Sequence, residues 1–118
     1  MLTFDEFTQI VEENVDLIPE KFCRGLNGGF NVLRESKGDG QFWTMAEYVE
    51  RGWLGKFILF YYGSFRAVLG NSPVETWKKE VLDTIFHELQ HHLESLAGRD
   101  DLARKELQEL AEILNGRF

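Results

Sequence analysis

Cysteine, long apolar runs and basic residues are scarce in this chain, and each shortage excludes a class of protein. Its 118 residues contain a single cysteine, Cys23, which cannot form an internal disulfide, so nothing requires an oxidising compartment. The longest apolar stretch, Phe57 to Tyr62, is far too short to span a bilayer. Because 20 Asp and Glu outnumber 13 Lys and Arg, the net charge is −7, which argues against nucleic acids and anionic membranes as partners.

The remaining composition is that of a globular protein. Hydrophobic residues make up 43% of the chain and aromatic residues 14%, which predicts one modest core and one domain, residues 1–118. The segment from Met1 to Glu6 has no basic region followed by an apolar run, so we expect no signal peptide and a cytoplasmic protein. We expect Cys23 to be a buried structural thiol rather than a nucleophile.

Helix and strand signals alternate irregularly along the first half of the chain. Thr3 and Glu6 form a capping box that predicts a first helix, and apolar residues follow at helical spacing. The stretch from Pro19 to Leu26 predicts a second, short helix. We predict strands over Phe30 to Leu33 and, most clearly, over Gly55 to Phe65, where aromatic and branched residues lie between glycines. Residues 42–53 favour neither state.

Two helices are predicted in the second half. Ser72 is expected to cap a long helix with Pro73 at its first position, and this helix should run to about Ala97, where Gly98 ends it. A last helix is predicted from Leu102 to Asn115, with an acidic pair before it as caps.

The run from His87 to His91 within the long helix reads H-E-L-Q-H. Residues four apart lie on one face of a helix, so the two histidines can direct both imidazoles at one metal ion. Zinc suits such a site because it binds neutral imidazole well and its tetrahedral geometry leaves room for water. The alternative is a solvated helix face that happens to carry two histidines. His92 falls in the apolar arc of this helix, which predicts a packed, hydrogen-bonded histidine rather than a ligand.

This arrangement predicts metal-assisted hydrolysis of a peptide or related amide. Zinc lowers the pKa of a bound water to roughly 7, which supplies hydroxide at neutral pH. Glu88 would be the general base that takes the proton from that water and passes it to the leaving amine. A zinc ion held by two histidines needs a third protein ligand. The acidic candidates near or after the motif are Glu94, Asp100, Asp101, Glu106 and Glu109.

The stretch from His87 to Leu102, H-E-L-Q-H-H-L-E-S-L-A-G-R-D-D-L, resembles the signature of the minimal zincin-like family of small bacterial metallopeptidases. Family members share a double His after H-E-x-x, a Gly, and an Asp-Leu soon afterwards. The aromatic segment from Leu59 to Arg66 is similar to their upstream strand. The resemblance implies a compact, zincin-like α+β domain in which a small sheet packs over a long motif helix with flanking helices.

The resemblance also implies roles for individual residues. His87 and His91 match the family's zinc ligands, Glu88 its catalytic glutamate, and Asp101 its acidic third ligand. Glu94 stands where the commoner motif has Gly. We rank Asp101 as third ligand before Asp100 and then Glu94, because the chain can turn back towards the site after the helix stops.

The sequence therefore predicts a zinc-dependent peptidase that acts on peptides or proteins in extended form. The predicted strand at residues 57–65 would offer an edge to which the substrate adds as a further strand. The alternative is a zinc-binding module without hydrolytic activity that works through protein interaction. A third reading, an interaction domain without metal, requires the H-E-x-x-H run to be accidental.

Overall fold

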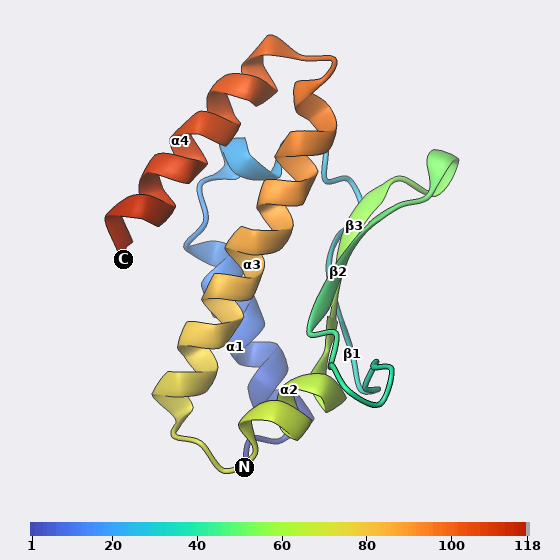
Figure 1. Ribbon diagram of the computed structural model, residues 1–118, viewed down its shortest axis with the longest axis vertical. Coiled ribbons are helices and arrows are strands. Elements are labelled where there is room, and N and C mark those ends of the chain that lie inside the picture. Colours follow the sequence, from blue (N-terminus) through green and yellow to red (C-terminus); the bar gives the residue numbers. More distant parts are fainter. Residues whose placement is uncertain (118) are drawn as a thin grey trace.

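A computed structural model describes residues 1–117, apart from the side chains of Leu54 and Arg117, and its elements form an α+β fold (Figure 1). In chain order these elements are α1 (Phe4–Asp16), the 3-10 turn η1 (Glu20–Cys23), β1 (Gly29–Leu33), β2 (Ala46–Glu50), the 3-10 turn η2 (Gly52–Leu54), β3 (Lys56–Tyr61), α2 (Tyr62–Leu69), α3 (Val74–Ala97) and α4 (Asp101–Arg117). The predicted fold class, α+β, is confirmed.

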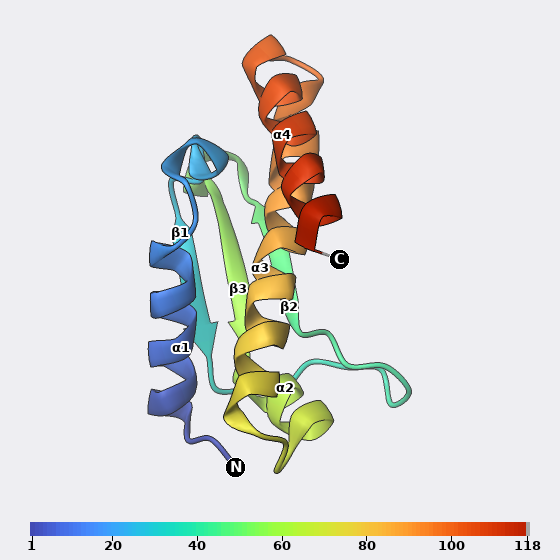
Figure 2. The ribbon, with the colours of Figure 1, turned by 90° about the vertical axis from the view of Figure 1, so that its left-hand side faces the viewer.

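The three strands form one sheet in the order β1-β3-β2, with β1 parallel and β2 antiparallel to the central β3. Helices α1 and α3 lie on the same face of this sheet, as Figure 1 shows with the sheet seen nearly edge-on. Helix α4 folds back after α3 and packs along it (Figure 2). The long helix that carries the H-E-L-Q-H run is therefore enclosed by the sheet on one side and by α4 on another.

The core forms between the sheet and the two helices on its covered face. On β3, Ile58 and Phe60 point to this face and are fully buried, whereas the alternating residues Phe57 and Leu59 are only half-buried. The ring of Phe7 from α1 contacts three aromatic rings from α2 and α3, which belong to Tyr62, Phe65 and Trp77. Burial of this aromatic cluster fixes the N-terminal half of α3 against the rest of the fold.

The predicted strand from Gly55 to Phe65 is too long, because β3 ends at Tyr61 and α2 begins at the next residue. The burial of Tyr62 and Phe65 explains why the chain changes from strand to helix here. Residues three apart point to opposite faces of a strand but to one face of a helix, and only a helix can bury both rings in the core. At Gly63 the chain passes so close to Ser36 that a Cβ would lie 2.6 Å from its backbone nitrogen.

Other helix predictions differ in detail from the structure. The capping box of Thr3 and Glu6 is confirmed, and α3 ends at Ala97 as predicted. Pro73 is not the first helical residue but occupies the cap position, with extended backbone at ψ 151° and no side-chain cap from Ser72. The helix predicted over residues 19–26 is reduced to the single turn η1. None of the helices formed by the described residues is long and apolar enough to cross a membrane.

Candidate metal centre

Helix α3 brings the two predicted histidine ligands together. His87 and His91 lie one turn apart on its exposed face, with 3.2 Å between their Nε2 atoms and an angle of 86° between their rings. Glu88 joins them, and one potential ligand atom from each of the three residues lies within 4.8 Å of the others. Within the described part of the chain, the structure thus gathers two imidazoles and one carboxylate at a single point.

The donor set and its spacing fit a zinc ion. Two imidazole nitrogens that bind zinc at about 2.0–2.1 Å with tetrahedral angles are about 3.3 Å apart. The two Nε2 atoms are already 3.2 Å apart, which matches the separation that a shared ion requires. The helix backbone places both residues on one face, one turn apart.

Glu88 differs from the histidines because its side chain is buried. It is only 7% exposed, and its carboxylate faces the backbone N–H of Tyr48 in β2. Burial raises the pKa of Glu88 above its ordinary value, while His91 and the Tyr48 N–H act in the opposite direction. A carboxylate held between a helix and a strand edge has the restricted motion and raised proton affinity that a general base needs.

Two hollows lie along the groove between β2 and α3, and Glu88 lines both of them. The larger, of about 620 Å³, extends past His91 towards Glu94 and Ser95. The smaller, of about 350 Å³, extends past His87 towards Thr84. The candidate centre therefore lies in the middle of a groove that is open on both sides, which suits a chain that passes through rather than a small enclosed molecule.

The strand that borders this groove is β2, so the prediction that residues 57–65 offer the free edge is wrong. That segment contains β3, which lies between β1 and β2 and pairs on both sides. In β2 the carbonyl of Met45 accepts from Tyr61, and bonded positions alternate along an antiparallel pair. Ala46, Tyr48 and Glu50 consequently turn their N–H and C=O groups away from β3, towards the groove.

The structure does not bring the predicted third ligand, Asp101, to the histidine pair. Asp101 begins α4, its side chain is 89% exposed, and it forms an ion pair with Arg104. Asp100 caps α4 through the N–H groups of Leu102 and Ala103 and binds Arg24. Because helix geometry carries both aspartates beyond the last turn of α3, a position after the helix stop does not return them to the site.

The remaining acidic candidates have partners of their own. Glu106 is buried in α4 and binds the guanidinium of Arg24, and Glu109 pairs with Lys21. Glu94 lies beside the site, but its carboxylate is 3.8 Å from Nδ1 of His91, on the opposite edge of the ring from the atom that faces His87. A carboxylate on this side acts on the histidine ring rather than on the metal, and at 3.8 Å it does so through its charge and not through a hydrogen bond.

This placement predicts different effects of two conservative substitutions on zinc affinity. Glu94→Gln should weaken zinc binding by about tenfold, the usual cost of losing a partner of a histidine ligand. Asp101→Asn should change it by less than about twofold, because Asp101 contacts only Arg104 in this region. Titration of zinc into both purified variants measures this. A large loss in Asp101→Asn alone would instead restore it as the third ligand.

Two other sequence expectations concern residues outside the metal centre. His92 is fully buried and bonded at both ring nitrogens, as predicted. Cys23 is partly buried against the core, and burial together with the nearby Glu20 raises the pKa of its thiol. A thiol that stays protonated at neutral pH is a poor nucleophile, which agrees with the structural role expected for it.

Sequence reasoning missed Tyr48 altogether. This residue lies in the segment that favoured neither helix nor strand, and no motif marks it. Its contribution to the site depends on its backbone N–H, which every non-proline residue has, and on the position of β2 beside α3. Only the packing of these two elements reveals it.

Comparison with known proteins places the chain in a family. A solved structure described as a conserved hypothetical protein from Thermo thermophilus has 42% sequence identity to it and a TM-score of 0.75. The match covers 83% of this chain and 100% of that one. The chain belongs to the family of that protein. No family model and no curated protein matches it. The description of this family member names no activity, so a function has to be argued from the geometry of the site.

Proposed function

We propose that the protein is a zinc-dependent peptidase of zincin-like type, with His87 and His91 as metal ligands and Glu88 as general base. The observation that carries this proposal is the 3.2 Å separation of the two Nε2 atoms beside a buried carboxylate on a groove. Zinc held there would supply a Lewis acid and a water that is acidic near neutral pH. This proposal leaves the third protein ligand of the zinc unassigned, and solvent or substrate would fill the open position.

Each residue of the motif has a distinct task in this proposal. His87 and His91 would present imidazole nitrogens to the metal, and the charge of Glu94 lies on the far edge of the His91 ring. Glu88 accepts the proton of the attacking water and delivers it to the leaving nitrogen, so the carboxylate is regenerated when the amide bond breaks. The Tyr48 N–H faces this carboxylate and would favour its charged form, which is the form that accepts a proton.

The groove favours an extended polypeptide as the substrate. A peptide that pairs with the free edge of β2 would use the outward backbone groups of Ala46 and Glu50, on either side of Tyr48. Main-chain pairing does not depend on the side chains of the substrate, so a small protein with shallow hollows can still bind a peptide. Because Glu88 lies at the centre of this edge, the scissile bond would lie near the middle of the bound segment.

The direct test is cleavage of a diverse peptide library by zinc-loaded protein, followed by mass spectrometry. We expect cleavage within extended peptides, loss of activity after chelation, and recovery when zinc is returned. Absence of cleavage by protein that holds stoichiometric zinc would contradict the peptidase proposal. It would favour the alternative of a non-catalytic zinc-binding module that acts through protein interaction.

A further inference from the structure

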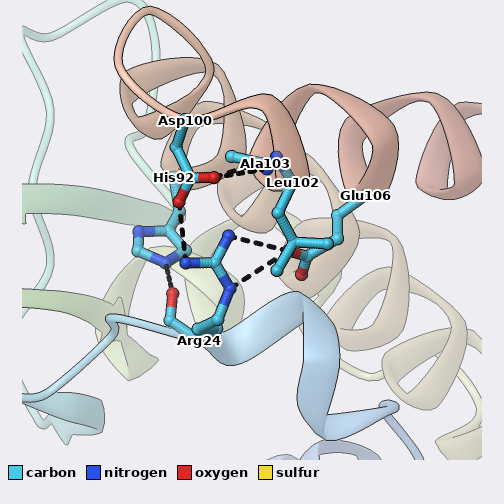
Figure 3. A network of polar contacts seen from close by, with 6 residues as sticks. All are labelled: Arg24, His92, Asp100, Leu102, Ala103 and Glu106. Atoms are coloured by element: carbon cyan, nitrogen blue, oxygen red, sulfur yellow. Dashed lines mark hydrogen bonds and ion pairs between the residues drawn. The ribbon is translucent and has the colours of Figure 1, made fainter.

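The histidine that follows the motif, His92, joins three parts of the fold. Its side chain is fully buried, with Nδ1 2.9 Å from the hydroxyl of Tyr48 and Nε2 2.7 Å from the carbonyl oxygen of Arg24. Figure 3 shows the second of these contacts and the polar network beyond it. His92 therefore connects α3 to the edge strand β2 on one side and to the segment after η1 on the other.

The direction of these hydrogen bonds follows from the groups involved. A carbonyl oxygen only accepts, so Nε2 of His92 must carry a hydrogen and donate it to Arg24. In a neutral imidazole Nδ1 then has a lone pair that can accept from the Tyr48 hydroxyl, for which the Glu50 carboxylate is a second acceptor. The two bonds are complementary, because each one favours the tautomer that the other needs.

The Arg24 carbonyl is itself held in place. The guanidinium of Arg24 binds Asp100, which precedes α4, at 2.8 Å and Glu106 of α4 at 2.8 and 3.1 Å (Figure 3). Asp100 in turn accepts from the first N–H groups of α4. Because these contacts fix the backbone of Arg24, the acceptor for His92 has little freedom to move.

Tyr48 contacts α3 through two groups. Its backbone N–H faces the Glu88 carboxylate, and its hydroxyl bonds to His92, one helical turn further along α3. Ser95 of α3 also donates a hydrogen bond to Glu50 of β2 beside this contact. The rings of Tyr48 and His92 are also in contact, with 5.3 Å between centroids. Residues 88 and 92 lie on the same side of the helix, so the two bonds run between the same pair of elements.

We propose that His92 and Tyr48 are positioning residues for the candidate base. The hydrogen bond between their side chains holds β2 at the distance from α3 at which the Tyr48 N–H reaches the Glu88 carboxylate. This inference rests on the proposed role of Glu88 for its functional meaning, but the geometry that it predicts can be measured without any catalysis. It also gives the second histidine of the H-E-x-x-H-H run a task distinct from metal binding.

The decisive variant is Tyr48→Phe, which removes only the hydroxyl and keeps the ring and the backbone N–H. We expect the amide of residue 48 to exchange with solvent about tenfold faster than in the wild type, the change that loss of one net hydrogen bond produces. Amides that join β2 to β3 should keep their protection. If the wild type hydrolyses peptides, kcat should fall by about tenfold while KM and zinc stoichiometry stay unchanged.

Tyr61→Phe is the matched control, because Tyr61 is also largely buried in the sheet and its hydroxyl bonds to Glu47 of the same strand β2. It does not link β2 to α3, so the exchange rate of amide 48 should stay within about twofold of wild type. The proposal is wrong if amide 48 exchanges at the wild-type rate in Tyr48→Phe. It is equally wrong if both variants accelerate that amide to the same extent.

Two substitutions at His92 provide a second, independent test. Asn keeps a hydrogen-bonding group near the Nδ1 position that faces Tyr48, whereas Gln keeps one near the Nε2 position that faces Arg24. We expect amide 48 to exchange more slowly in His92→Asn than in His92→Gln, by about threefold or more. Equal rates in the two variants would count against the proposal. A wild type that cleaves nothing would refute the peptidase function alone, since the exchange measurements would still decide the positioning role.

Discussion

Glu88→Gln should reduce peptide hydrolysis by about 100-fold or more while leaving zinc binding within a few-fold of the wild type. The substitution keeps the size of the side chain and can still accept a hydrogen bond from the Tyr48 N–H, so the contact between α3 and β2 survives. An amide cannot take a proton from water, so only the base is removed. The rate at which a library peptide is hydrolysed measures the first effect, and zinc titration measures the affinity.

The same substitution elsewhere on α3 provides the control. Glu75 lies in the first turn of this helix with its carboxylate side chain 81% exposed, so Glu75→Gln should leave both turnover and zinc affinity unchanged. If Glu88→Gln hydrolyses peptides as fast as the wild type, then Glu88 is not the base. If it instead loses zinc, its carboxylate is a ligand and the assignment of roles within the motif has to change.

His87→Ala and His91→Ala should each abolish stoichiometric zinc binding. The two Nε2 atoms are the candidate metal-ligand atoms and lie side by side, so the loss of either residue leaves a single imidazole on an exposed helix face. Loss of a residue that merely supports a ligand costs about 10–100-fold in affinity, so loss of a ligand itself should cost at least about 100-fold. Metal analysis after zinc exposure and dialysis measures this.

Lys78→Ala serves as the control for this second prediction, because Lys78 is exposed on α3 far from the histidine pair. Its zinc content should equal that of the wild type. Both histidine variants should also keep the helical circular dichroism of the wild type, since the two side chains are exposed and make no core contact. Unchanged zinc content in both variants would show that the ion, if any, binds elsewhere.

Local rules predicted correctly the features that depend on neighbours in the chain. The 3.6-residue period places His87 and His91 on one face, and the structure shows them there. The capping box at Thr3 and Glu6 and the end of α3 near Gly98 also follow from short-range signals. Burial of His92 followed from its place on the apolar arc of the same helix.

The failed predictions share a dependence on packing between distant segments. A run of aromatic residues suggested one long strand, but the need to bury Tyr62 and Phe65 together turned its second half into α2. The third-ligand ranking assumed that the chain returns after Gly98, whereas capping of α4 by Asp100 and the ion pair with Arg24 carry it away. Neither contact leaves a local pattern in the sequence.

The sequence by itself determined that one helix carries two imidazoles and a carboxylate at metal-binding spacing, because an α-helix fixes the relative positions of residues four apart. Tertiary structure alone decided the surroundings of that helix. It placed β2 rather than β3 at the free edge, set the Tyr48 N–H against Glu88, and moved Asp101 away from the histidines. These outcomes depend on which strands pair and how helices pack over them, and such long-range choices follow from burial of the whole core rather than from any local run of residues.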